Sequence, residues 1–351
     1  MHAVYNNVFI KRIDYIIPGV NKELSGTRVL TSEIEERAMS AISRTPFKVP
    51  DNFIRFYTNV MERYFWKDDV RLEEECRKLL GRCRDEKVDF SKIKLPIYAA
   101  LTKEIIEPST MIRIMKGFPF PKEAMPFDIS NACLGMANAV VMIANAVNSG
   151  QTEQGLAIGF EDSRQVTLDT LKDLQEHYTA NKDKQHLRLN TPSLTLGSGA
   201  LSIVVGSDGG MCKIKGYVSL SDASCADLCI GRRHKDKILI QTKAEKLERN
   251  GVMIVKESVR RAMELFGWSR VNFAVTHQVG RSHQRNAEEN LRDICDNCSY
   301  TTFEKYGNMG TLSMPFTLAK AYEEGLIKKG GRALAIGFGS GLVSCVLGLE
   351  F

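Results

Sequence analysis

An almost unbroken run of small and apolar residues between positions 127 and 150 is the clearest pattern in the chain. Positions 127–132 have the pattern of a short buried strand, and Cys133 follows at a turn. From Leu134 to Asn148 the residues are small or apolar on nearly every side, which predicts a helix buried all round. Ser149 and Gly150 end this helix.

Cys133 lies where the predicted strand passes into the predicted helix. At such a place, unpaired backbone N–H groups and the positive end of the helix dipole favour a negative charge. We therefore expect a lowered pKa for this thiol and a nucleophilic thiolate. The position fits a small cysteine packed in the core equally well, and the cysteine alone does not separate the two interpretations.

Buried strands alternate with helices along the rest of the chain, and a polar loop is expected at 232–237. This alternation predicts an α/β protein with largely parallel sheet layers and helices between and outside them. The expected strands lie at 4–16, 93–101, 217–220, 238–241 and 273–277, and the expected helices begin at 31 or span 69–85, 252–266 and 315–326.

A repeat divides the chain into two halves. The segment Leu156–Phe160 recurs unchanged as Leu334–Phe338, 178 residues later (334 − 156). The strand at 95–101 has a counterpart at 271–276 at nearly the same offset. Such self-similarity predicts two pseudo-equivalent α/β halves, which we assign to residues 1–209 and 210–351.

Composition narrows the class of protein. The chain has 351 residues, of which 43% are hydrophobic and 26% charged, as in ordinary globular proteins. We expect no membrane span and no export signal, and the nine cysteines, an odd number, indicate reduced thiols in the cytoplasm. A net charge of +6 suits a phosphate-bearing or acidic partner but is too small to predict nucleic-acid binding.

Two further turns carry polar residues next to buried elements. His277 ends a predicted strand, and Asn308 lies in a glycine-flanked turn. Together with Cys133 they form a set able to transfer acyl groups: the thiolate attacks a thioester, and the imidazole and carboxamide stabilise an oxyanion. Each residue also has a plain structural explanation, since His277 suits a strand end and Asn308 tolerates a left-handed backbone.

The order of several motifs resembles the condensing enzymes of the thiolase superfamily, on the branch of 3-oxoacyl-[acyl-carrier-protein] synthase III. The resemblance implies a five-layered α-β-α-β-α thiolase fold and a homodimer. It also implies that Cys133 carries the acyl group, that His277 and Asn308 stabilise the enolate, and that Gly339, Ser340 and Gly341 help form the oxyanion hole. The motifs that carry it lie at 128–135, 196–200, 276–278, 306–310 and 337–342.

Within that branch, Glu107 resembles the glutamate base of the OleA type, which joins two fatty acyl-CoA molecules without decarboxylation. An ordinary acyl thioester must lose an α-proton and needs a general base, whereas malonyl decarboxylation does not. A helix N-terminal carboxylate followed by Pro108 is the alternative for Glu107. Two departures from the family pattern are Asn59 in place of a glycine and Ser198 in place of an acid.

The sequence therefore predicts an acyltransferase that acylates Cys133 from a fatty acyl-CoA and condenses it with a second acyl thioester to a β-keto product. A malonyl-dependent synthase III working with acyl-carrier protein is the alternative in the same fold. A catalytically silent thiolase-fold partner is the alternative from another class. We expect no metal and no cofactor, with coenzyme A or carrier thioesters as substrates.

Overall fold

The computed structural model describes residues 1–20, 25–42, 49–103, 105–180 and 184–351. One sheet of 11 strands runs through the molecule in the order β13-β12-β14-β15-β9-β2-β8-β7-β5-β6, with β1 paired to β9. Its strands are β1 (His2–Val4), β2 (Phe9–Ile16), β5 (Ile93–Ala99), β6 (Phe127–Ile129), β7 (Gln154–Glu161), β8 (Gly199–Gly206), β9 (Cys212–Ser221), β12 (Val271–Thr276), β13 (Cys295–Asn297), β14 (Arg332–Gly339) and β15 (Val343–Glu350).

Helices pack on both faces of this sheet and form a separate group at one end of the molecule. The helices are α1 (Thr31–Ile42), α2 (Phe53–Thr58), α3 (Leu72–Asp85), α4 (Thr110–Met115), α5 (Gly135–Asn148), α6 (Arg164–Ala180), α7 (Lys184–Asn190), α8 (Ala244–Phe266), α9 (Arg281–Leu291), α10 (Phe303–Tyr306) and α11 (Ser313–Glu323). Four short 3-10 turns lie at Phe90–Lys92, Thr191–Thr195, Ala223–Leu228 and Gly310–Leu312.

The strand order repeats on either side of the β2–β9 junction. Read outward, the first half runs β2-β8-β7-β5-β6 and the second runs β9-β15-β14-β12-β13. The two copies of the repeated pentapeptide lie in β7 and β14, which hold the same place in these orders. The expected boundary between residues 209 and 210 falls between β8 and β9, and as a division into domains it stays a prediction.

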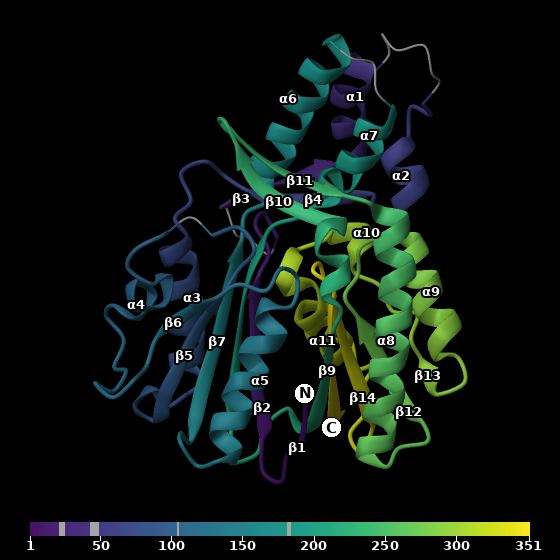
Figure 1. The fold of residues 1–351 in the computed structure, drawn as a ribbon. Coiled ribbons are helices and arrows are strands. Elements are labelled where there is room, and N and C mark those ends of the chain that lie inside the picture. The colour runs from purple at the N-terminus through teal and green to yellow at the C-terminus, as the bar shows by residue number, and fades with distance from the viewer. Residues whose placement is uncertain (21–24, 43–48, 104, 181–183) are drawn as a thin grey trace.

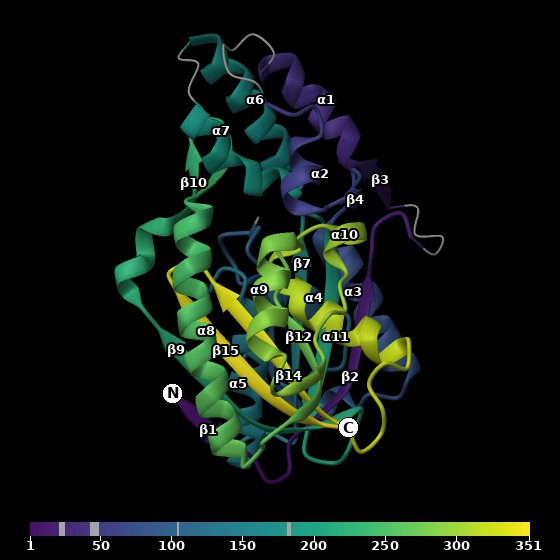
Figure 2. The ribbon, with the colours of Figure 1, turned by 90° about the vertical axis from the view of Figure 1, so that its right-hand side faces the viewer.

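Five layers stack across the molecule, as expected for a thiolase fold (Figure 1). In the first half α3 packs on β2, β7 and β8, and α5 packs on β5, β7 and β8. In the second half α11 packs on β12 and β14, while α8 covers β9, β14 and β15. Helices α5 and α11 thus form the central layer, with α8 and α9 on the far side of the second half (Figure 2).

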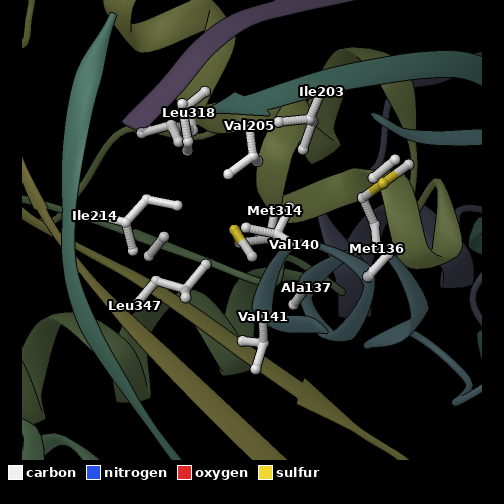
Figure 3. Close-up of a cluster of buried hydrophobic side chains, with 14 of the residues drawn as sticks. Met136, Ala137, Val140, Val141, Ile203, Val205, Ile214, Met314, Leu318 and Leu347 are labelled. Carbon is white, nitrogen blue, oxygen red and sulfur yellow. The ribbon is translucent and has the colours of Figure 1, made fainter. Parts of the chain in front are cut away.

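The all-apolar segment expected at 134–148 is α5, and it is buried between the half-sheets. Side chains of α5 and α11 meet residues of β8, β9 and β15 in one cluster (Figure 3). Its labelled members are Met136, Ala137, Val140, Val141, Ile203, Val205, Ile214, Met314, Leu318 and Leu347. The helix that follows Cys133 is therefore anchored in the main core.

Two expectations about the strands are wrong: that the sheet layers are largely parallel, and that 232–237 is a loop. Only β5–β6, β5–β7, β12–β13 and β12–β14 are parallel, and the inner pairs are antiparallel. Three residues, 340–342, join β14 to β15, and so short a connection allows only an antiparallel pair. The polar segment 232–237 is not a loop, because β10 (Cys229–His234) and β11 (Lys237–Thr242) form a hairpin that turns at Lys235.

A smaller group of elements lies at the top of Figure 1. Helices α1, α2, α6 and α7 lie there with the β10–β11 hairpin and the pair β3 (Gly26–Leu30) and β4 (Glu62–Trp66). No helix in the described ranges is long and apolar enough to cross a membrane.

Candidate active site

Cys133 lies one residue before the N-cap of α5, in the turn that follows β6. Ala132 takes a left-handed conformation with φ 45°, and Leu134 N donates a hydrogen bond of 2.9 Å to Asn131 O. This tight turn places the cysteine at the edge of the core, where the residue as a whole is half-buried. The predicted strand–turn–helix geometry is present, with the thiol at the start of a buried helix.

The end of β14 lies directly against this turn. A Cβ at Gly339 would be 3.6 Å from Cys133 N, and one at Gly337 would be 2.5 Å from Leu134 Cδ2. Because a side chain at Gly337 would overlap Leu134, glycine there permits this close approach. The predicted oxyanion loop therefore begins in contact with the nucleophile turn, and Ser340 and Gly341 continue it half-buried.

His277 follows the last residue of β12, on the strand next to β14. Its backbone N–H donates to Ile336 O at 2.8 Å, and its ring centroid is 6.1 Å from that of Phe338. The side chain is buried, and its Nδ1 has no hydrogen-bond partner among the described residues. The imidazole thus lies beside the β14 end that contacts Cys133, with a ring nitrogen unpaired.

Asn308 is held in its turn by both its backbone and its side chain. Asn308 N donates to Thr195 O, and Gly197 N donates to Asn308 O, each at 2.9 Å. The side-chain Oδ1 accepts from Gly310 N at 3.0 Å and Ser313 Oγ at 3.1 Å. Because Oδ1 is occupied in this way, the amide Nδ2 remains to donate to another group.

The Asn308 turn also touches the start of α5. Met136 N donates to Thr311 Oγ1 at 2.6 Å, so one free N–H of the helix N-terminus is satisfied from the second half. The structure therefore brings the Cys133 turn, the β14 end and the turns of His277 and Asn308 to one end of the two half-sheets. These segments lie far apart in the sequence, so their residues alone did not predict that they meet. Only the resemblance to the order of motifs in the family implied it.

Glu107 is not in this cluster. It is exposed on the loop between β5 and α4, and across the described residues no hydrogen bond or ion pair holds its carboxylate. The preceding residue, Ile106, is 95% exposed. The glutamate therefore has no role in its own chain's site that the structure makes visible.

The expected lowering of the Cys133 pKa is wrong for the resting site. The pKa of the thiol is raised to about 12, mainly by burial and further by the nearby Cys229 and Glu161, while a backbone hydrogen bond acts in the opposite direction. Loss of water around the sulfur outweighs the helix terminus, because the charged form is the one that burial penalises. Burial, with a smaller contribution from His283, lowers the pKa of His277 to about 3. The resting pair is therefore a neutral thiol and a neutral imidazole.

Glu161, a buried carboxylate at the end of β7, was not predicted from the sequence as a site residue. It stands at the position in the first repeat that corresponds to Gly339 in the second (161 + 178), so the repeat was a usable signal. No group of three or more metal-ligating side chains is present in the described part of the chain.

A groove between α8 and α9 was also missed. Its volume is about 640 Å³, and its inner end reaches Thr276, His283 and Phe338, next to His277. The amphipathic pattern of α8 predicted the helix but not which apolar residues remain uncovered. The groove is lined mainly by apolar side chains, among them Val252, Val255, Val259, Met263, Leu291 and Ile294.

Comparisons with known proteins agree with the fold. The family model described as "3-Oxoacyl-[acyl-carrier-protein (ACP)] synthase III C terminal" matches residues 266–350. The chain is similar to an acyl-CoA:acyl-CoA alkyltransferase of Shewanella oneidensis, with 26% identity over 99% of both chains. It is also similar to a beta-ketoacyl-[acyl-carrier-protein] synthase III of Clostridium tetani, with 25% identity over 83% of this chain and 87% of the relative.

Among solved structures, an OleA variant from Xanthomonas campestris superposes with a TM-score of 0.86 and 24% identity over the full length of both chains. At that identity the superposition establishes the fold, which is the thiolase fold. The family match and the full-length relatives support a thiolase-superfamily condensing enzyme, similar to the acyltransferases that include 3-oxoacyl-[acyl-carrier-protein] synthase III.

Proposed function

We propose that this protein condenses two fatty acyl-CoA molecules head to head, with Cys133 as the acyl carrier. The convergence of Cys133, the β14 end, His277 and Asn308 is the observation that carries the proposal. In the first step the sulfur bonds to the acyl carbon, and coenzyme A leaves as the thiol. In the second, an α-carbanion of another acyl thioester attacks that carbon, and the Cys133 thiolate leaves to give a β-keto thioester.

Because the Cys133 thiol and the His277 imidazole are both neutral at rest, each reaction step needs a named proton donor and acceptor. The Cys133 thiol must lose its proton as it attacks, and the unpaired nitrogen of neutral His277 is able to accept it. Asn308 Nδ2 then donates to the enolate oxygen of the second substrate, while main-chain N–H groups near Cys133 and Gly339 serve the acyl carbonyl. The nitrogen assigned to accept this proton, His277 Nδ1, has no other partner among the described residues.

Glu107 supplies the base for the second step. Solved structures of Xanthomonas campestris OleA include variants at a glutamate, a cysteine and a histidine. In that protein the glutamate precedes the cysteine by 26 residues (143 − 117), the same separation as Glu107 from Cys133 (133 − 107). The histidine follows by 142 residues there (285 − 143) and by 144 here (277 − 133).

The exposed position of Glu107 fits a site shared between two copies of the chain. Strand β6 is an edge of the main sheet, and Ile106, Ile112 and Met125 around it are exposed. An apolar edge strand is a ready surface for pairing with another strand. A homodimer across β6 would carry the Glu107 loop to the partner's Cys133.

All nine cysteines are free thiols, which fits a reducing, cytoplasmic location.

The groove between α8 and α9 would hold one of the two acyl chains. Its apolar lining suits a hydrocarbon chain, and its inner end lies beside His277, where the reacting carbons meet.

Malonyl-dependent synthesis on a carrier protein is the second candidate, because the family match and the Clostridium tetani relative belong to synthase III. The two candidates differ in whether Glu107 is needed.

The acylation step predicts a mass change. Wild-type protein mixed with a panel of fatty acyl-CoA thioesters should gain one acyl group per chain, seen by intact mass spectrometry. Cys133→Ala should show no gain, because the acceptor sulfur is missing. Cys229→Ala serves as the matched control, since that nearby thiol should be dispensable. No gain with any thioester would favour the silent partner.

The raised pKa predicts a pH profile for the resting thiol. Alkylation of Cys133 by iodoacetamide should rise about tenfold per pH unit from pH 7 to pH 10 without a plateau, because thiolate forms only near pH 12. Rates would be measured by peptide mass spectrometry, which separates Cys133 from the other cysteines. A plateau below pH 8 would contradict the neutral resting thiol.

Replacement of the proposed base should separate the two reaction steps. Glu107→Gln should leave acylation of Cys133 within about threefold of wild type and lower condensation of two acyl-CoA molecules by about a hundredfold or more. Condensation that proceeds normally in Glu107→Gln with malonyl-carrier as donor would instead favour the synthase III candidate. Both half-reactions would be followed by product mass spectrometry.

Mixed dimers test whether Glu107 acts across the interface. Cys133→Ala and Glu107→Gln chains, each inactive alone, are co-expressed with different tags. If the base acts in trans, random mixing should restore about a quarter of wild-type activity, because half of the dimers are mixed and each has one complete site. No recovery in purified mixed dimers would place the base in its own chain.

The groove predicts chain-length selection. Val259→Trp should lower kcat/KM for long-chain acyl-CoA by about tenfold or more and spare short chains, because the indole fills space that only long chains use. Met253→Trp is the control, since Met253 is exposed on the same helix and does not line the groove. Equal losses for all chain lengths would contradict this use of the groove.

A further inference from the structure

Glu161 is a buried carboxylate with no positively charged partner among the described residues. It is 1% exposed and lies at the last position of β7. Four donors converge on it: Leu101 N at 2.8 Å, Thr102 N at 3.0 Å, Thr102 Oγ1 at 2.7 Å and Thr311 N at 3.3 Å. Only a carboxylate accepts this many bonds at two oxygens, whereas an amide would turn a donor toward some of them.

These donors belong to two different parts of the site. Leu101 and Thr102 begin the loop that leads from β5 to Glu107. Thr311 lies three residues after Asn308, and its hydroxyl accepts from Met136 N at the start of α5. One carboxylate therefore joins the loop of the proposed base to the turn of the proposed enolate donor.

The contact with the Asn308 turn leaves no spare room. A Cβ at Gly310 would lie 2.9 Å from Glu161 Oε1, and Gly310 has a φ of 56°. Glycine is therefore required there both for the left-handed backbone and for the approach of the carboxylate. The turn that carries Asn308 is shaped around Glu161.

The pKa of Glu161 is raised, so a negative charge on this buried side chain is costly. Burial raises the pKa of Glu161, and the four hydrogen bonds act in the opposite direction. The same carboxylate also raises the pKa of Cys133, which makes the thiol harder to ionise. A group that served packing alone would be better neutral in this place.

We propose that Glu161 is a positioning residue that holds the Asn308 turn of its own site and the Glu107 loop of the partner's site in one register. The inference rests on the proposed function. It makes Glu161 matter more for condensation, which needs both the enolate donor and the base, than for acylation, which needs neither. Each Glu161 therefore positions one segment in its own site and one segment that serves the partner's site. A displacement of Glu161 in one chain would affect both sites of the dimer.

Hydrogen exchange tests the positioning without any substrate. In Glu161→Gln, the amides of Leu101, Thr102 and Thr311 should exchange about tenfold or more faster, because each loses a charged acceptor. Asp169→Asn is the matched control, since this buried carboxylate accepts from Gln165 Nε2 and Ile238 N, outside the site. Unchanged exchange in Glu161→Gln would overturn the proposal, even if the enzyme turned out to have another substrate.

The half-reactions give the second readout. Glu161→Gln should slow condensation by about tenfold or more and acylation by less than about threefold. Glu161→Asp, which keeps the charge on a shorter arm, should recover part of the loss. Equal slowing of both half-reactions, with faster exchange throughout the chain, would mean simple destabilisation and would also overturn the proposal.

Two threonine variants keep the test decisive if Glu161→Gln does not fold. Thr102→Val removes a donor on the Glu107 loop and should slow condensation alone. Thr311→Val removes the acceptor for Met136 N at the start of α5 and should slow acylation as well. Identical effects of the two variants would contradict separate connections through Glu161. Failure of wild-type protein to be acylated would sink the proposed function, and the exchange result would still stand.

Discussion

The burial of α5 between two half-sheets is the constraint on which the rest of the structure depends. The helix is apolar or small on nearly every side, and each Val or Ile it buries contributes roughly 1.5–3 kcal/mol. Its polar side chains are also satisfied, since Asn138 Oδ1 accepts from Asn131 and Asn145 Oδ1 from the Tyr5 hydroxyl. A helix fixed in this way from both halves sets the position of Cys133 with little freedom.

Much of the fold could be predicted because the burial pattern is strong wherever elements are covered on both faces. The helix at 134–148, the strand at 93–101 and the repeat in β7 and β14 all follow from apolar runs. Strand direction could not be predicted, because a buried strand has the same composition whether its neighbours are parallel or antiparallel. The expected strand at 238–241 is present in β11, but the end of β10 was mistaken for a loop because its exposed residues include Arg232 and His234, which give no apolar alternation.

The candidate site was predictable in its residue types but not in its electrostatics. A helix terminus stabilises a nearby anion by about 0.3–1 kcal/mol, and by ~2 kcal/mol at most. A rise of the Cys133 pKa to about 12 corresponds to roughly 4 kcal/mol against the thiolate, so burial decides the outcome. The sequence shows where the helix starts but not how dry the sulfur is or that Glu161 lies nearby. The role of Glu107 was proposed from the sequence, but a single chain does not show its place in a site, because that place depends on a second chain.

The two departures from the family pattern are accommodated by hydrogen bonds to neighbouring residues. Asn59 takes the left-handed conformation that a glycine would supply, with φ 61°, and its side chain bonds Glu304 and Arg281. Ser198 lacks the family's acid, but its hydroxyl donates to Asp162 Oδ1 at 3.4 Å and accepts from Ser163 N at 3.1 Å. A carboxylate is therefore still present beside this strand, supplied from the end of β7.

The Ser198–Asp162 hydrogen bond also affects the Asn308 turn. Gly197, the residue before Ser198, donates its N–H to Asn308 O, and a Cβ at Gly197 would lie 2.1 Å from Tyr306 O. The strand lead-in at 197–199 must therefore stay close to the turn, and the Ser198–Asp162 contact holds it there in place of the missing acid. Asp162 and Glu161 are consecutive, so the end of β7 supports Asn308 from two sides. Glu161 at Thr311 N and Asp162 at Ser198 Oγ thus fix the two segments that flank Asn308.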